Sequence, residues 1–141
     1  MSQENIDLVL RLLEANARRD WDAVYAEYAP DIEWEDTSGL WGDWGVARGH
    51  AALREAWRGW FEIFGEVSWH LDEELVEAGE DVVATYDVRG RGRESGAPVQ
   101  QRITLVWSVH GGKVVRVRSY GERAEALQAV GLAAQARAPR R

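Results

Sequence analysis

The carboxylate best placed for chemistry in this chain is that of Asp36, in the segment Pro30 to Gly39. Ile32, Trp34 and Asp36 alternate with two glutamates, so a strand here would turn two large apolar side chains and one carboxylate to the same side. A carboxylate on an apolar face is costly unless it is paired or lines a cavity. We therefore interpret the segment as the floor of a pocket with Asp36 as a general base, and an Asx turn at the strand end is the structural alternative.

Three further side chains are candidates to act with Asp36. His50 follows a glycine at the start of a predicted helix, where it is either a cap or exposed residue or an acid–base partner of the carboxylate. Tyr86 and Tyr120 are predicted to face the cavity, as hydrogen-bond donors to a ligand or as core tyrosines. The candidate catalytic set is Asp36, His50 and Tyr120. No pair of histidines has ligand spacing, so neither a metal nor a cofactor is expected.

Eight tryptophans in 141 residues indicate either a large aromatic core or a cavity for a flat or cyclic ligand, because indole bodies are apolar and their N–H groups need partners. Trp41 and Trp44 lie in a glycine-rich loop over 37–48 and are predicted to form a lid. The predicted ligand-binding residues are Trp34, Trp41, Trp44, Trp57, Trp60, Phe61, Trp69, Tyr86, Leu105, Trp107, Val117 and Ser119.

Composition narrows the class of protein. The chain is 45% hydrophobic and 29% charged, and its net charge of −7 argues against nucleic acid or an anionic membrane as partner. The absence of cysteine excludes disulfides and thiolate chemistry. The acidic N-terminus is not a signal peptide and no apolar run reaches membrane-spanning length, so we expect a cytoplasmic protein. One domain is expected over 1–132, followed by a frayed tail over 133–141.

Hydrophobic periodicity predicts an α+β fold. Helices are predicted over 2–19, 21–29 and 49–64, with a strand over 31–36 before the third, and four antiparallel strands and a helix over 122–132 follow. The apolar stripe of the first helix is predicted at Ile6, Val9, Leu10, Leu13 and Ala17. A strongly curved, mostly antiparallel sheet wrapped over the N-terminal helices would form a cone-shaped barrel with a deep apolar mouth.

The last two strands are predicted to pair around Gly111-Gly112. Their inward residues are predicted to include Ile103, Leu105, Trp107, Val115, Val117 and Ser119. The outward face would carry Arg102, Thr104, Val106, Arg116 and Arg118. Because this face mixes apolar area with charge, we expect a homodimer that pairs across it.

Several segments together resemble a known family: RDWDAV (19–24), YAPDIEWED (28–36), RGHAAL (48–53), RGRG (89–92), SG (95–96) and GKVV (112–115). They resemble nuclear transport factor 2-like proteins, and within them the SnoaL-like and ketosteroid isomerase-like small proteins, up to about Leu132. The resemblance implies a cone-shaped fold around a cavity. It does not imply one activity, since such proteins include isomerases, cyclases, hydrolases and non-catalytic binders.

By this resemblance, Asp36 takes the position of the isomerases' catalytic base. The positions that match the isomerases' tyrosine and aspartic acid donors hold Leu12 and Leu105, which cannot donate a hydrogen bond. The positions that match the arginine and second aspartate of limonene epoxide hydrolases hold Thr85 and Ser119. Two hypotheses follow: an enzyme that moves a proton on a small cyclic or polyketide-like substrate with Asp36 as base, or a non-catalytic binder of an apolar small molecule.

Overall fold

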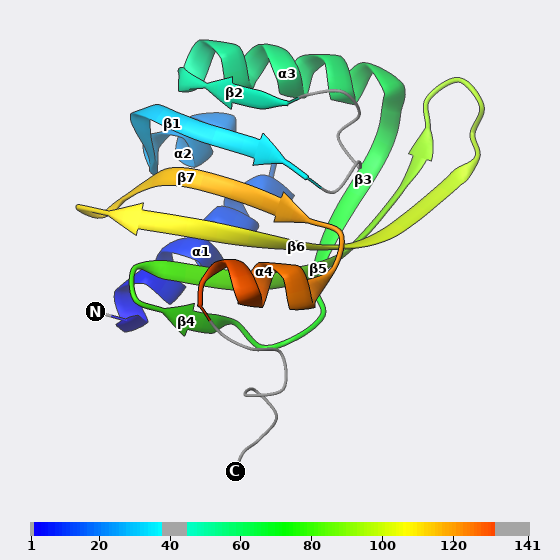
Figure 1. Cartoon of the computed structure of the whole chain (residues 1–141). Coiled ribbons are helices and arrows are strands. Elements are labelled where there is room, and N and C mark those ends of the chain that lie inside the picture. The colour runs from blue at the N-terminus through cyan, green and yellow to red at the C-terminus, as the bar shows by residue number, and fades with distance from the viewer. Residues whose placement is uncertain (1, 38–44, 132–141) are drawn as a thin grey trace.

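The structure, a computed structural model, describes residues 2–37 and 45–131. The helices are α1 (Ser2–Ala17), α2 (Trp21–Ala26), α3 (Gly49–Ile63) and α4 (Arg123–Ala129). The strands are β1 (Tyr28–Asp36), β2 (Val46–Arg48), β3 (Phe64–Leu71), β4 (Val76–Ala78), β5 (Asp81–Gly92), β6 (Pro98–His110) and β7 (Lys113–Tyr120) (Figure 1). The predicted lid residues Trp41 and Trp44 and the predicted tail over 133–141 lie outside the described residues.

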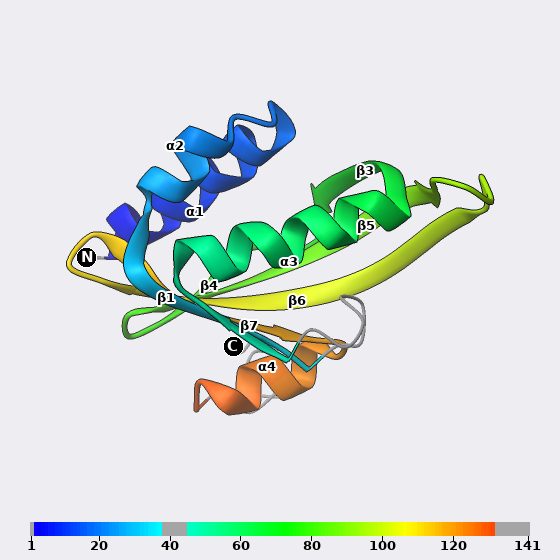
Figure 2. The same cartoon turned by 90° about the horizontal axis from the view of Figure 1, so that it is seen from above.

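A single curved sheet organises the molecule. Its strands follow the order β2-β1-β7-β6-β5-β3, and β4 pairs with β5 outside this path. Every pairing is antiparallel except that of β1 with β7. The long strands β5 and β6 bend across the molecule, and the sheet stays open (Figures 1 and 2). The predicted α+β fold with a strongly curved, mostly antiparallel sheet is confirmed, whereas β2 and β4 are too short to be predicted from periodicity.

The helices lie on both sides of this sheet. Figure 2 shows α1, α2 and α3 over one face and α4 on the other. Helix α3 buries Leu53 and Trp60 and passes directly into β3, close to the predicted boundary. In the described ranges 2–37 and 45–131, no helix is long and apolar enough to cross a membrane.

The buried side of α1 differs from the predicted stripe. Leu8, Val9, Leu12 and Ala15 are buried, whereas Leu10 is 40% exposed. The sequence of α1 carries two overlapping apolar stripes, and the position of the sheet decides between them. Leu12 thereby points into the interior, which matters for the site below.

The junction between α2 and β1 also differs in detail. Asp20 caps α2 as its spacing suggests, because its Oδ1 accepts a hydrogen bond from the backbone N–H of Ala23 at 3.2 Å. The helix ends at Ala26 instead of Ala29, and Pro30 lies inside β1, where the pairing with β7 changes register between Tyr28 and Glu33. Such an irregularity is where a strand tolerates proline, which has no N–H to donate.

Inward-facing side chains of β6 and β7 contribute to the core. Ile103, Leu105 and Trp107 are buried as predicted. A register shift after Ser108 brings Val114 opposite Val109, so Val114 takes the inward position that was predicted for Val115. A β-bulge of this kind changes the alternation that the sequence pattern assumes.

The outward face of the sheet is covered by the chain's own last helix. Ala126 and Leu127 of α4 pack against Val83 and Val106. The prediction that Thr104 and Val106 form an open apolar surface is wrong, because they are 1% and 0% exposed.

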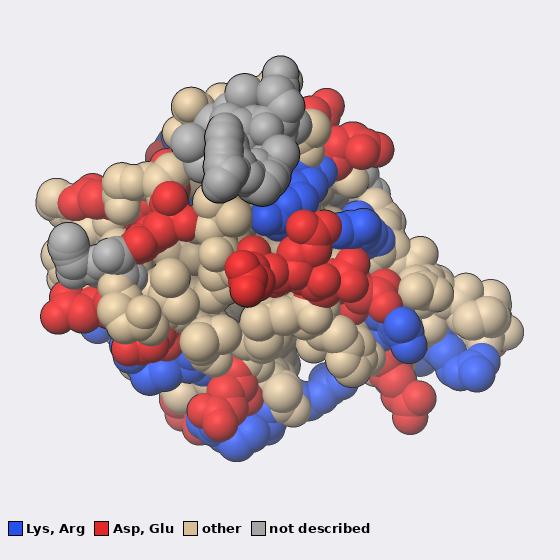
Figure 3. Space-filling model, turned by 90° about the horizontal axis from the view of Figure 1, so that it is seen from below, with Lys and Arg blue, Asp and Glu red and all other residues tan. Residues whose placement is uncertain are grey.

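The arginines predicted on this face are paired with acids of the same chain. Arg102 forms ion pairs with Asp72 and Glu73, and Arg116 lies 3.2 Å from Glu35. Figure 3, which looks at the molecule from below the view of Figure 1, also shows acidic and basic side chains lying side by side. The exposed part of the outward face therefore consists of charged side chains that pair with opposite charges of the same chain. The apolar area on which the dimer prediction rested is not exposed.

Candidate functional site

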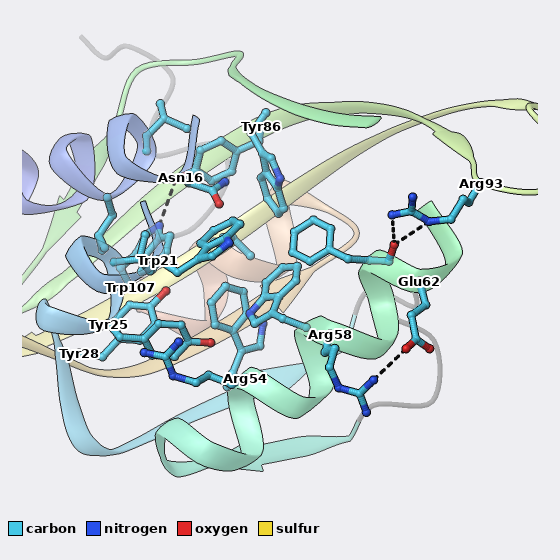
Figure 4. A pocket seen from close by; sticks show the side chains of 18 residues that line it. Asn16, Trp21, Tyr25, Tyr28, Arg54, Arg58, Glu62, Tyr86, Arg93 and Trp107 are labelled. Atoms are coloured by element: carbon cyan, nitrogen blue, oxygen red, sulfur yellow. Dashed lines mark hydrogen bonds and ion pairs between the residues drawn. The ribbon is translucent and has the colours of Figure 1, made fainter. Parts of the chain in front are cut away.

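A cavity of about 520 Å³ lies between helices α1, α2 and α3 and the inner face of the sheet (Figure 4). Its position follows from the fold, because the curved sheet and the three N-terminal helices leave space between their apolar faces. The lining residues are Leu12, Leu13, Asn16, Trp21, Val24, Tyr25, Tyr28, Trp34, Arg54, Trp57, Arg58, Phe61, Glu62, Trp69, Tyr86, Arg93, Leu105 and Trp107.

Aromatic rings form the floor of the cavity. The ring of Trp34, on β1, meets Trp57 of α3 and Trp107 of β6 edge-on, with centroids 5.4 and 5.8 Å apart. Trp57 also stacks on Phe61 at 5.7 Å with an interplanar angle of 29°. These contacts hold the indole faces in fixed directions, so the cavity presents rigid flat walls to an aromatic or alicyclic ring.

Two buried phenols supply polar groups to this floor. Trp107 Nε1 donates a hydrogen bond to the hydroxyl oxygen of Tyr86 at 3.2 Å. Tyr86 and Tyr28 are 2% and 6% exposed, and within residues 2–37 and 45–131 neither hydroxyl donates its proton to a protein acceptor. Burial raises the pKa of both phenols well above the ordinary value. Both therefore remain protonated donors at neutral pH.

Charged side chains surround the mouth of the cavity. The Arg54 guanidinium lies over the ring of Tyr25, 3.9 Å from its centroid (Figure 4). Burial raises the pKa of Tyr25 to about 12, and the positive charge of Arg54 acts in the opposite direction. Arg58 donates to Glu62 at 2.8 Å. Arg93 reaches from the β5–β6 hairpin and donates two hydrogen bonds to the backbone oxygen of Phe61 at the end of α3.

Seven of the predicted ligand-binding residues line this cavity: Trp34, Trp57, Phe61, Trp69, Tyr86, Leu105 and Trp107. Trp60, Val117 and Ser119 are buried but belong to the surrounding core and not to the lining. Leu12 and Leu105, which stand at the positions of the isomerases' donors, both line the cavity as apolar wall.

Asp36 lies at the end of β1, two residues beyond Trp34 on the same side of the strand. It is half-buried, and the Ser119 hydroxyl donates to its Oδ1 at 2.8 Å, across the pairing of β1 with β7. It is not among the residues that line the cavity. The described part of the structure therefore places the candidate base beside the cavity wall, next to the segment 38–44.

His50 takes up a position away from Asp36. Its Nε2 lies 3.1 and 3.3 Å from the backbone oxygens of Ala29 and Tyr28, and because carbonyls only accept, Nε2 carries the hydrogen. These contacts are at the start of β1, and Asp36 is at its end. At about 3.3 Å per residue the separation along the strand is roughly 20 Å. The structure does not bring the two together.

Tyr120 lies on the other side of the sheet. It packs against Val83, Val106 and Leu127 under α4, because its neighbour Ser119 faces inward and successive strand residues alternate. The prediction that Tyr120 faces the cavity is wrong.

Sequence reasoning missed the polar residues of the cavity. Tyr25, Tyr28, Arg54 and Arg58 were not among the predicted site residues. They meet at one mouth because α2 packs opposite α3, which no local pattern specifies. Among the residues that the structure describes, no group of three His, Cys, Asp or Glu side chains is arranged to hold a metal ion.

Comparisons with known proteins agree with this geometry. The sequence model of the SnoaL-like domain matches residues 9–117. An NTF2-like protein from Burkholderia pseudomallei is similar, with 27% identity over 93% of this chain and 99% of that chain, and a TM-score of 0.77. An NTF2-like protein from Burkholderia xenovorans is 28% identical over 93% of this chain and 98% of that chain, with a TM-score of 0.72. TerC, co-crystallised with polyporic acid, is 21% identical over 90% of this chain and 98% of that chain, with a TM-score of 0.75. Comparison with curated protein sequences finds no match.

Proposed function

This chain belongs to the SnoaL-like domain family, and from that premise we propose that it binds a ring-shaped small molecule with a carbonyl or hydroxyl oxygen. The observation that carries the proposal is one cavity of about 520 Å³ that combines an aromatic floor with two buried phenol donors. Cavities for small organic ligands are typically about 300–1,000 Å³ in volume and mostly apolar, with a few convergent polar groups.

The phenols supply the hydrogen-bond donors that are missing at the positions of Leu12 and Leu105. Leu12 and Leu105 cannot donate, but Tyr28 and Tyr86 reach the same interior from β1 and β5. A ligand oxygen at the floor would accept the Tyr86 proton while Trp107 continues to donate to the other side of that hydroxyl. The indoles would meanwhile cover the faces of the ring.

A structural relative supports a small-molecule ligand. TerC was co-crystallised with polyporic acid, which favours a small-molecule ligand for this fold without naming one for this chain.

The proposal is tested by calorimetric titration with a matched pair of ligands, 1-tetralone and tetralin, which differ in one carbonyl oxygen. We expect 1-tetralone to bind more tightly. Trp57→Leu should weaken both ligands, because Trp57 lines the cavity. The control Leu127→Ala, in α4 on the other face of the sheet, should leave them nearly unchanged once folding is verified by circular dichroism. Equal effects of the two substitutions, or no binding of either ligand, would overturn the proposal.

Proton transfer with Asp36 as general base is a second candidate function. It is favoured by one observation: a half-buried carboxylate follows cavity-lining Trp34 on the inner side of β1, with a Ser119 hydroxyl to orient it. Asp36 could act as a general base on a ligand that extends past Trp34 to the end of β1, where it would remove a proton next to the ligand's carbonyl.

This second candidate is tested by deuterium exchange at C2 of 1-tetralone, followed by NMR in D₂O. We expect the protein to accelerate exchange and Asp36→Asn to abolish the acceleration, since an amide cannot accept the proton. If Asp36→Asn exchanges as fast as the unaltered protein, Asp36 is a structural residue that pairs with Ser119.

Assembly as a homodimer also stays a proposal. The outward face is covered by α4 over its apolar part, so a dimer would form through the charged remainder near Arg102 and Arg116. An interface of that kind is expected to weaken with salt.

A further inference from the structure

Among the described residues, two guanidinium groups that line the cavity, those of Arg54 and Arg93, and one beside it, that of Arg19, form no ion pair with an acid. Arg54 lies over Tyr25 at 3.9 Å, and Arg19 lies over Phe61 at 5.6 Å. Arg93 donates only to backbone oxygens at the end of α3. Within the described ranges, none of the three has a carboxylate oxygen within 4.0 Å.

This is unusual for the arginines of this chain. Every other described arginine except Arg91 forms an ion pair with Asp or Glu, and Arg91 donates to the backbone oxygen of Gly96 at the hairpin tip. The chain carries 24 acidic residues against 17 basic ones, so carboxylates are not scarce. Of the four described arginines that lack a carboxylate partner, Arg54 and Arg93 therefore line the cavity and Arg19 lies beside it, over Phe61.

The cavity itself offers no compensating charge. Glu62 is the one carboxylate among the described lining residues, and it is already bonded to Arg58. Figure 4 shows Arg54 beside the phenol rings of Tyr25 and Tyr28, with Arg93 at the opposite end of α3. An anion at the mouth would thus meet a local positive potential on a protein whose net charge is −7.

We propose that the ligand is an anionic ring compound whose carboxylate lies at the mouth against Arg54 while its ring occupies the aromatic floor. This inference rests on the proposed small-molecule function of the cavity and specifies the class of ligand. A guanidinium presents paired N–H donors that match a carboxylate, and the stacking of Arg54 on Tyr25 fixes its direction before the ligand arrives.

The test uses naphthalene-2-carboxylate and its neutral isostere naphthalene-2-carboxamide, titrated by calorimetry at low and at physiological salt. We expect the unaltered protein to prefer the carboxylate by about tenfold at low salt, as a charge-assisted hydrogen bond at a partly open site would give. Arg54→Gln should remove most of that preference without weakening the carboxamide. The matched control is Arg91→Gln, which removes a guanidinium that lacks a carboxylate partner but lies away from the mouth.

The outcomes separate the two proposals. Binding of both compounds with equal affinity, or a preference that Arg54→Gln leaves intact, overturns the anionic ligand while the cavity function stands. A preference lost equally in Arg91→Gln overturns it too, because the effect would then come from overall charge. Failure of both compounds to bind, together with failure of 1-tetralone, refutes the cavity function and the inference with it.

Discussion

Replacing Tyr86 by Phe removes one hydroxyl with two roles, and the structure predicts a separate effect for each. Trp107 Nε1 loses the oxygen to which it donates at 3.2 Å, inside a region where both residues are buried. A buried donor left without an acceptor costs about 1–3 kcal/mol. Because the cavity adjoins this pair and admits water, we expect the loss of unfolding free energy to fall in the lower half of that range.

The ligand effect is expected to be selective. The hydroxyl would donate to the oxygen of 1-tetralone, and a hydrogen bond of that kind contributes about 1 kcal/mol, which is roughly a fivefold change in affinity. Tetralin has no oxygen and should bind Tyr86→Phe as tightly as the unaltered protein. The ratio of the two affinities, measured by calorimetry, should therefore fall about fivefold. Stability is measured in parallel by urea unfolding.

The matched control is Tyr120→Phe, since Tyr120 packs on the other face of the sheet under α4. It should leave the ratio of affinities unchanged. If Tyr86→Phe also leaves the ratio unchanged, or if Tyr120→Phe lowers it equally, the Tyr86 hydroxyl does not face the ligand and the reasoning is refuted.

Three further predictions follow from burial and charge. Since burial raises the pKa of Tyr28 and Tyr86, the unfolded chain loses these protons first above about pH 10. The contribution of the two tyrosines to the free energy of unfolding in urea should be constant below that pH and then fall by up to about 1.4 kcal/mol per pH unit for each tyrosine, less steeply in Tyr28→Phe. A flat profile above about pH 10 would contradict this. Leu105→Ala should cost about 2–5 kcal/mol in urea unfolding, because Leu105 is 1% exposed, while allowing larger rings to bind; a cost under about 0.5 kcal/mol would show that its packing is loose. Light scattering at micromolar protein should give a dimer that dissociates as salt is raised, and a monomer at all salt concentrations would remove the dimer proposal.

Much of the fold could be predicted from the sequence, because the helices and long strands show clear hydrophobic periodicity. The change from helical to alternating spacing after the predicted helix over 49–64 indicated the order of the elements that the structure has. The errors came where tertiary structure chooses between equal local patterns. Leu10 was predicted on the buried side of α1 but is exposed, because the sheet lies on the other side of the helix. Val114 is buried in place of Val115 because a bulge changes the alternation of side chains along β7.

The site was predictable in its apolar half only. An excess of tryptophan pointed to the floor, and residues such as Trp34 and Trp107 do line the cavity. The polar half depends on which helices face each other across the mouth. Tyr28 and Arg54 come from different elements and lie close only after packing, so neither spacing nor residue type marks them. Tyr120 was misplaced by assigning it the same strand face as its neighbour Ser119.

The central claim, that the cavity binds an oxygen-bearing ring between indoles and phenols, is tested most directly by a crystal structure of the protein with 1-tetralone. We predict that the ring lies among Trp34, Trp57 and Trp107, with the ketone oxygen within hydrogen-bond distance of the Tyr86 hydroxyl. Density for the ligand at any other place on the protein, or a ring in the cavity whose oxygen points away from both Tyr28 and Tyr86, would contradict the account.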